Sequence, residues 1–167
     1  KIKILEGYFM IRKNLVVENA QIAFRNFAGK ETKYNRAGNR NFCVIFDKAT
    51  GEDLKEQGWN VRILAPRDEY DEPAYCLQVA VAFGHFPPKI YMINGRRKME
   101  LNEDTIDCLD YAEIENVDVI IRPYNWEVGG KTGVKAYVQT MYVQIQEDRF
   151  AAKYDYSEPI DEGDSPF

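Results

Sequence analysis

Residues 116–146 read NVDVIIRPYNWEV (116–128), GGKTG (129–133) and VKAYVQTMYVQIQ (134–146). The first and last of these runs are rich in β-branched and aromatic residues, and the Gly-rich connection between them is typical of a β-hairpin. The stretch therefore predicts two long antiparallel strands. Pro123 lies inside the first run, and because proline has no backbone N–H to donate, it predicts an edge, a bulge or an interruption there.

Alternation along this hairpin gathers cations and rings on one face. Arg122, Tyr124 and Trp126 are two residues apart, so they share a face of the first strand. We predict a register in which Val128 pairs with Gly133. The pairs that follow from it are Trp126 with Lys135, Tyr124 with Tyr137, and Arg122 with Gln139. A slip of one residue would instead bring Ala136 and Val138 to this face, so the arrangement depends on the register.

A face of cations interleaved with rings suits a single-stranded nucleic acid. Cations follow the phosphates, and flat rings stack on bases without reading their sequence, each stack contributing about 1 to 3 kcal/mol. The alternative is that Tyr124, Trp126 and Tyr137 are half-buried sheet aromatics with a solvated charged rim. The residues alone leave both interpretations open.

Two further basic clusters lie outside the hairpin. The stretch RNFAGKETKYNRAGNRNF (25–42) holds five cations against the single acid Glu31, and GRRK (95–98) holds three consecutive cations. Each alone is typical of a solvated loop, but together with the hairpin they predict a sided, basic surface. The nucleic-acid-binding residues that we predict are Arg25, Lys30, Lys33, Tyr34, Arg36, Arg40, Arg96, Arg97, Lys98, Arg122, Tyr124, Trp126, Lys131, Lys135 and Tyr137.

The remaining pattern predicts a mainly β chain with short inserted helices. We expect further strands at residues 15–27, 41–46, 59–64, 75–83 and 89–93, with 28–40 as a loop and 66–73 as an exposed turn. Thr50, followed by Asp53, fits a helix start and predicts a helix over 51–57; Asn102 predicts a second over 102–111. Six to eight strands with two short helices favour a small OB-like barrel over a parallel sheet.

The net charge of −5 comes from the end of the sequence. Residues 155–167 carry five carboxylates and neither Lys nor Arg, which leaves 22 acidic and 22 basic residues in 1–154. A run of this kind buries almost nothing and is expected to be solvated. We therefore predict one nucleic-acid-binding domain over residues 1–154 and an acidic partner-binding tail over 155–167.

Composition also restricts where the protein works. Cys43, Cys76 and Cys108 are an odd number without C-x-x-C spacing, which favours a reducing compartment over a disulfide framework. Apolar runs are shorter than the roughly 20 residues that a membrane-spanning helix needs, and the first residues are too mixed for a signal peptide. We expect a soluble, intracellular protein that does not bind a membrane.

The tail resembles the acidic C-terminal tip of bacterial single-stranded DNA-binding proteins, in which an acidic run precedes a small residue or Ile and then Pro-Phe. The match is DEGDSPF (161–167), with Ser165 a looser fit than an apolar residue. In that family the tip recruits replication and repair proteins, and a pocket with a basic rim binds its terminal Phe and carboxylate. The resemblance implies a partner-binding role for Asp161, Glu162, Asp164, Pro166 and Phe167.

The body resembles a different family, the phage-encoded single-stranded DNA-binding proteins with an OB-like barrel. The resemblance covers most of residues 17–154. The segments that carry it are AQIAFRNFAGKETKYNRAGNRNFCVIF (20–46), GWNVRILAPRDEYDEPAY (58–75), PPKIYMI (87–93) and VDVIIRPYNWEVGGKTGVKAYVQTMYV (117–143). It implies a sequence-nonspecific protein of phage DNA replication and recombination in the cytoplasm of the bacterial host, without a cofactor.

Enzymatic chemistry has little support in the sequence. His85 is the only histidine, and zinc spacings, a phosphate-binding G-x-x-x-x-G-K-[ST] loop and G-x-S-x-G are all absent. One enzymatic alternative is a Mg²⁺-dependent nuclease, with ligands drawn from Asp68, Glu69, Asp71, Glu72, Asp104, Asp107 and Asp110. Another alternative is a protein-interaction module without nucleic-acid function, in which the aromatic hairpin is a homodimer surface. We expect no enzyme, no metal site and no cofactor.

Overall fold

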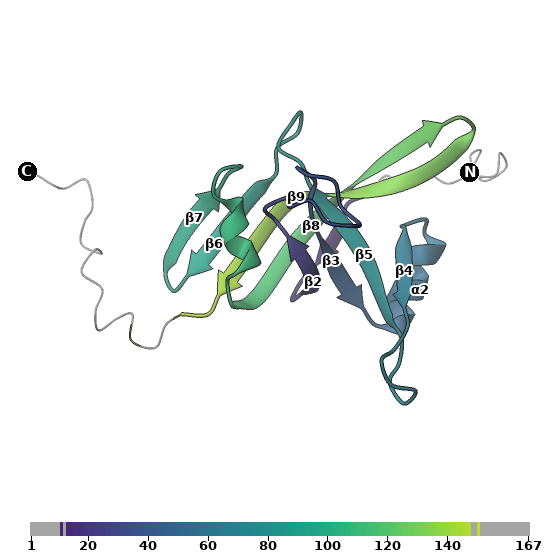
Figure 1. Ribbon diagram of the computed structural model, residues 1–167, viewed down its shortest axis with the longest axis horizontal. Helices are drawn as coiled ribbons and strands as arrows, with labels where there is room; N and C mark the ends of the chain where they lie inside the picture. The colour runs from purple at the N-terminus through teal and green to yellow at the C-terminus, as the bar shows by residue number, and fades with distance from the viewer. Residues whose placement is uncertain (1–10, 12, 148–149, 151–167) are drawn as a thin grey trace, which may run out of the picture.

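The structure is a computed structural model that describes Ile11, residues 13–147 and Phe150 (Figure 1). The tail at 155–167, with the predicted partner-binding residues, lies outside the described residues. The elements in chain order are β1 (Leu15–Val17), β2 (Gln21–Asn26), β3 (Arg40–Phe46), α2 (Lys48–Glu56), β4 (Val61–Leu64), β5 (Ala74–Val81), β6 (Lys89–Asn94), β7 (Arg97–Leu101), the 3₁₀ helix η1 (Ile106–Asp110), β8 (Ile114–Val128) and β9 (Lys131–Ile145).

The predicted mainly β architecture is confirmed, with nine strands in one sheet. The hydrogen-bonded order is β1-β8-β9-β5-β3-β2, while β4 pairs with β5, and β6 pairs with both β9 and β7. No ladder joins β1 to β2 among the described residues, so the predicted barrel is an open sheet. The largest fully buried side chains come from most of these elements and include Phe27, Phe42, Leu77, Ile90, Leu101, Ile106, Leu109, Ile121 and Met141.

The β8–β9 hairpin is the longest element, and its turn is tighter than the sequence predicts. Gly129 and Gly130 have φ values of 57° and 82°, so they form a two-residue turn that a Gly-Gly pair readily adopts. Val128 pairs with Lys131, and the predicted pairing with Gly133 is wrong by two residues. Because side chains alternate with a period of two, the predicted face survives this shift. The observed pairs are Trp126 with Gly133, Tyr124 with Lys135, and Arg122 with Tyr137.

A bulge divides the hairpin into two halves. Ile120 pairs with Thr140 and Ile121 with Val138, so Gln139 has no partner on β8. We call residues 114–120 and 140–145 the base half, and residues 121–128 and 131–138 the tip half. β1 pairs only with residues 119–121 of β8, so no described strand pairs with β8 on that side at Pro123. This position agrees with the predicted edge.

The two halves differ in their surroundings. The base half lies between β1 and β6, whereas the tip half extends past β5 and projects from the body (Figure 1). The parallel pairing with β5 involves only Ala136 and Tyr137 of β9. The projection leaves the outward face of the tip half available to other molecules.

Three sequence predictions need correction elsewhere. The strand predicted over 15–27 is interrupted at 18–20, where Asn19 has φ 54° and its N–H donates to Oδ1 of Asp118 at 2.9 Å. Helix α2 begins at Lys48 rather than at 51, because the Asp47 carboxylate accepts the Thr50 N–H at 2.7 Å and caps it; this hydrogen bond lowers the pKa of Asp47.

The second predicted helix, over 102–111, is only the short 3₁₀ helix η1. The Asn102 side chain does accept the N–H groups of Asp104 and Thr105, at 2.8 and 3.1 Å, as a cap would. Strand β7, which the sequence analysis missed, forms a hairpin with β6 through Gly95, whose φ is 64°. Among the described residues, no helix is long and apolar enough to cross a membrane.

Candidate nucleic-acid interface

The outward face of the tip half holds a cluster of cations and rings. The Arg122 guanidinium lies between two rings, with Cζ 5.1 Å from the centroid of Tyr137 and 5.3 Å from that of Phe86. Lys135 places Nζ 5.3 Å from the Tyr137 centroid. Tyr124 meets Tyr137 edge to face, with centroids 6.2 Å apart and planes at 84°. An edge-to-face contact occupies a face of only one of the two rings, and Tyr124 stays 52% exposed, so part of its ring is open to a stacked base.

Trp126 lies across the backbone of its cross-strand partner Gly133. A Cβ built on Gly133 would lie 2.6 Å from Cε2 and 2.9 Å from Nε1 of Trp126. A side chain at this position would displace the indole, so Gly133 is what allows the ring to lie flat on β9. The indole is 37% exposed and keeps part of its surface free for a ligand.

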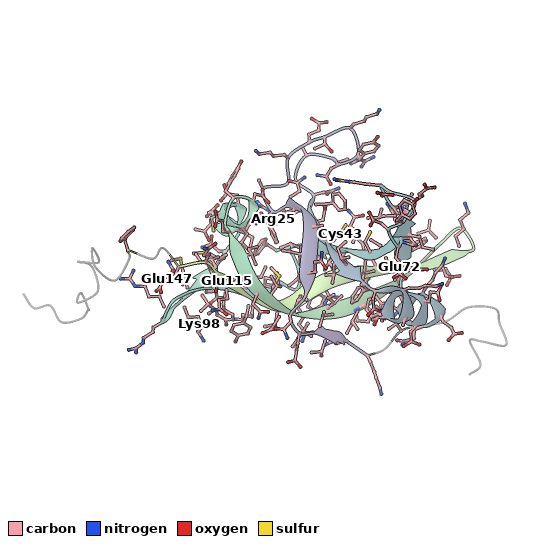
Figure 2. The ribbon with its side chains drawn as sticks, turned by 90° about the horizontal axis from the view of Figure 1, so that it is seen from below. Arg25, Cys43, Glu72, Lys98, Glu115 and Glu147 are labelled. Carbon is pink, nitrogen blue, oxygen red and sulfur yellow. The ribbon has the colours of Figure 1, made fainter. Side chains whose placement is uncertain are left out.

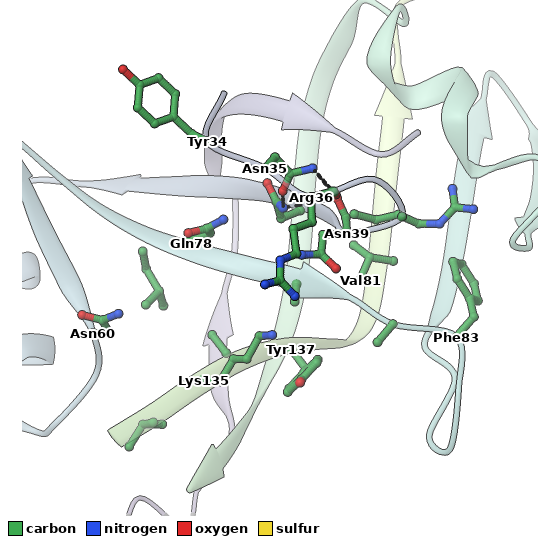
Figure 3. Close-up of a pocket in the computed structure, with 18 of the residues that line it drawn as sticks. Tyr34, Asn35, Arg36, Asn39, Asn60, Gln78, Val81, Phe83, Lys135 and Tyr137 are labelled. Atoms are coloured by element: carbon green, nitrogen blue, oxygen red, sulfur yellow. Dashed lines mark hydrogen bonds between the residues drawn. The ribbon is translucent and has the colours of Figure 1, made fainter. Parts of the chain in front are cut away.

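A groove of about 780 Å³ connects this cluster to the loop at residues 28–39, and we call it the hairpin groove (Figure 3). Its floor includes Gln78, Ala80 and Val81 of β5. The predicted site residues that line it come from both the loop and the hairpin, and they are Tyr34, Arg36, Arg40, Trp126, Lys135 and Tyr137. The structure therefore brings together two clusters that are about a hundred residues apart in the sequence.

The hairpin groove is basic. Arg36 of the loop and Lys135 of β9 reach into it from different sides, whereas the Tyr34 ring points away (Figure 3). Arg40 is the third cation in the lining, and Glu103 is the only acid among the described residues that line the groove. Cations directed into one groove favour a bound polyanion.

Hydrogen bonds hold the 28–39 loop in shape. The Asn35 side-chain amide donates to the carbonyls of Lys30, Arg36 and Asn39 at 2.9 to 3.1 Å, and its Oδ1 accepts from the amide of Asn41 at 2.9 Å. The backbone N–H of Gly38 also donates to the carbonyl of Gly29 at 2.8 Å. The loop is thus organised around a single side chain, and Arg36 is presented from a defined framework.

Arg25 and Arg40, two of the predicted cations, donate to backbone carbonyls of the protein. Arg25 donates from one guanidinium nitrogen to the carbonyls of Leu109 and Ala112, both at 2.8 Å. Arg40 donates to the carbonyl of Phe27 at 2.7 Å, and its Cζ lies 5.9 Å from the Phe83 centroid. These contacts tie η1 and the start of β3 to the body, so both arginines have a structural role in addition to their charge.

The basic cluster at 96–98 lies away from the hairpin groove, in the β6–β7 hairpin at the other end of the molecule (Figures 1 and 2). Lys98 places Nζ 4.9 Å from the Tyr91 centroid and 5.9 Å from that of Tyr142. Lys89 pairs with Glu100 at 3.9 Å, and Glu147 lies against Gly95. Glu100 and Glu147 therefore lie in the same hairpin region as this cluster, and the structure does not bring the cluster into the hairpin groove.

Of the other predicted residues, Lys33 lies in an exposed turn and Lys131 is the exposed first residue of β9. Lys30 lines a second groove on the far side of the 28–39 loop. The sequence analysis missed Asn35, Phe83 and Phe86. The two phenylalanines lie in AFGHFPP (82–88), between β5 and β6, and contact Arg40 and Arg122. Two rings in a short segment with Gly and Pro were the available signal, but their partners became apparent only from the tertiary fold.

The described residues contain no group of three or more His, Cys, Asp or Glu that could hold a metal ion. Asp110, one of the residues considered as Mg²⁺ ligands, accepts the N–H groups of Phe27 and Ala28 with its two oxygens at 2.6 and 3.0 Å.

Burial raises the pKa of Cys43 to about 12, so its thiol is neutral at physiological pH.

Comparisons with known proteins place the chain in a family. The family model described as "Putative phage ssDNA-binding domain" matches residues 7–166. No curated protein matches the chain in sequence. A C-terminally truncated single-stranded DNA-binding protein of bacteriophage Enc34 superposes with a TM-score of 0.52 at 11% identity, covering 81% of this chain and 87% of that one. The same phage protein in complex with ssDNA gives a TM-score of 0.52 at 12% identity, covering 82% and 89%.

These solved structures share the fold, and the family is one of binding proteins rather than enzymes. The resemblance of the body to the phage-encoded single-stranded DNA-binding proteins is therefore confirmed, and both the nuclease and the interaction module without nucleic-acid function are set aside. By its family model, matched over nearly its whole length, the chain belongs to the phage ssDNA-binding domain family.

Proposed function

We propose that the chain binds single-stranded DNA in the hairpin groove, without sequence preference. The observation that carries this proposal is the meeting of two sequence-distant clusters: Arg36 of the loop and Lys135 of the hairpin reach into one groove beside the rings of Trp126 and Tyr137. The Enc34 protein, which has the same fold, is known in complex with ssDNA.

The roles of the residues follow from their chemistry. Arg36, Arg122 and Lys135 attract phosphates, while Trp126 and Tyr137 stack on bases. Every base has a flat face, so stacking tolerates any sequence. Duplex DNA hides its bases between the two strands, and we expect the groove to prefer a single strand for that reason.

The tail at 155–167 is proposed to have two roles. Its five carboxylates can occupy the basic groove when DNA is absent and leave it when DNA binds, because like-charged groups compete for the same cations. The run at 161–167 would then recruit replication or recombination proteins in the host cytoplasm. Removal of 155–167 should strengthen DNA binding at low salt and abolish recruitment; an unchanged low-salt affinity would remove the competition.

The proposal is tested by titrating tryptophan fluorescence with a dT oligomer and with a duplex of equal length, at two salt concentrations. Trp59 is buried, so a ligand on the surface reports mainly through Trp126. We expect quenching by the single strand that weakens steeply with salt, since binding releases counterions. A Trp126→Phe variant is the control, and it should bind with little quenching.

A homodimer that buried the same aromatic face would give a different result. Its formation would depend on protein concentration and respond little to salt, because apolar contacts release no counterions. Absence of binding to either oligomer, checked by anisotropy, would contradict the proposed function.

A further inference from the structure

A second groove, of about 640 Å³, lies on the other side of the 28–39 loop, between β2, β3, β4 and η1. We call it the ring groove, because three exposed aromatic side chains line it: Phe24, Tyr34 and Tyr111, which are 66%, 89% and 74% exposed. Its cations are Arg25, Lys30 and Arg62. Apart from Arg25, Lys30 and Tyr34, none of these residues was predicted from the sequence.

The two grooves are adjacent. Tyr34, Asn35, Asn41 and Gln78 line both of them. Asn41 of β3 and Gln78 of β5 lie on neighbouring strands, so the two grooves share this part of the sheet surface. A chain molecule that leaves the hairpin groove along this surface enters the ring groove.

Phe24 is held in a conformation that its residue type disfavours. Its φ is 53°, within a bulge where the β2–β3 register shifts between Ala23 and Asn26. A bulky residue rarely adopts a positive φ, and such strain is found preferentially at functional sites. Here the strained backbone presents an apolar ring to solvent, which stability alone does not explain.

Tyr111 is oriented by Lys30. The ammonium donates to the Tyr111 hydroxyl at 2.9 Å and lies 5.5 Å from the ring centroid. This hydrogen bond raises the pKa of Lys30, so the side chain stays charged at neutral pH. A ring and a fixed cation are therefore presented together.

The charge of the ring groove suits single-stranded DNA, the ligand proposed for the hairpin groove. Asp110 is the only acid among the described residues that line it, and both of its carboxylate oxygens accept backbone N–H groups. Arg62 projects from β4 beside Cys43, close enough that its charge opposes the rise in that thiol's pKa. The groove therefore combines open rings with positive charge, as the hairpin groove does.

We propose that the ring groove binds a second stretch of the same DNA strand, with bases stacked on Phe24 and Tyr111 and phosphates near Lys30 and Arg62. The strand would cross from one groove to the other over Asn41 and Gln78. This inference rests on the proposed function of the hairpin groove, and it makes the binding site longer than that groove alone.

The test compares two oligomers, dT of about 4 and about 16 nucleotides, which span the range of site sizes for an OB fold. The short oligomer is followed by quenching of Trp126, and the long one also by anisotropy. For Phe24→Ala/Tyr111→Ala, we expect binding of the long oligomer to weaken about tenfold or more, while the short oligomer quenches Trp126 with unchanged affinity.

Tyr70→Ala is the matched control, because Tyr70 is 87% exposed in the turn at 66–73 and lines neither groove. It should change neither affinity. If the double variant folds poorly, Arg62→Gln with Tyr111→Leu replaces it, since both changes leave the strained backbone at Phe24 untouched.

Equal affinities of the double variant and the wild type for the long oligomer would overturn the inference, but would not contradict the proposed DNA binding in the hairpin groove. An equal loss for both oligomers would also overturn it, because the two grooves would then not be separable. Failure of the wild type to bind either oligomer would instead contradict the proposed function.

Discussion

The base and tip halves of the β8–β9 hairpin are made from the same two strands, but their rings are arranged differently. In the base half, Tyr142 stacks on Tyr91 of the neighbouring strand β6 with centroids 4.9 Å apart and planes at 26°, and Lys98 of β7 lies over both rings. In the tip half, Tyr124 and Tyr137 are perpendicular. Rings that already stack on each other have used a face each, so composition alone does not identify a binding surface.

The inward face is buried in both halves, by Val117, Val119, Met141 and Val143 in the base half and by Ile121, Ala136 and Val138 in the tip half. On the outward face of the tip half, Tyr124, Trp126 and Val128 are exposed. We therefore expect the inward face to stabilise the fold and the outward face of the tip half to bind DNA.

The largest effect is expected from Met141→Ala in the base half. Met141 is fully buried, and removing a large core side chain costs about 2 to 5 kcal/mol. Chemical denaturation should show a correspondingly lower free energy of unfolding. Tyr142→Ala, one residue along on the outward face, should lower the free energy of unfolding much less. Equal losses in the two variants would contradict the assignment of Met141 to the inward face and Tyr142 to the outward face.

Trp126→Ala should produce the largest loss of DNA affinity. One lost stack corresponds to about 1 to 3 kcal/mol of binding free energy, while the free energy of unfolding should change by about 0.5 kcal/mol or less because the side chain is partly exposed. Anisotropy with a dT oligomer and denaturation measure the two quantities. Val128→Ala, at the same hairpin end, is the control, and unchanged affinity of Trp126→Ala would remove Trp126 from the site.

Gly133→Ala should weaken binding in the same direction but less. The new methyl group would push the indole of Trp126 off the backbone of β9 without removing it. The emission maximum of Trp126 should move with the ring, and affinity should fall by only part of the loss in Trp126→Ala. An unchanged emission spectrum together with unchanged affinity would show that Gly133 does not determine the position of the Trp126 indole.

Neutralising one groove cation should mainly alter the salt dependence. Each phosphate contact contributes about −0.7 to the slope of log K against log salt for a single strand. Arg36→Gln and Lys135→Gln should each make the slope shallower by about that amount. Lys98→Gln, on β7 beside the base half, is the matched control. A shallower slope for this variant would show that the DNA also contacts the cluster at 96–98, as the sequence predicted.

The sequence predicted the tip face because alternation is insensitive to a two-residue shift. The register error arose from treating residues 129–133 as one connection, although Gly129 and Gly130 alone make the turn. A one-residue error would have turned the face inward, and only the tertiary structure excludes it.

The rest of the site depends on contacts between distant segments. Nothing local indicates that Phe86 meets Arg122, or that the 28–39 loop lies opposite Lys135. Phe24 has an ordinary strand sequence around it, and its positive φ follows from the bulge opposite β3. The cations at 96–98 show the reverse case, in which a strong local pattern lies at the wrong end of the fold for the hairpin groove.

The most direct test is to photo-cross-link a bromouracil-containing single strand to the full chain and map the linked residues by mass spectrometry. Both halves of the hairpin present rings, so each can report contact. We predict cross-links at Tyr124, Trp126 or Tyr137 in the tip half. Cross-links confined to Tyr91 and Tyr142 would contradict the assignment of DNA binding to the tip half.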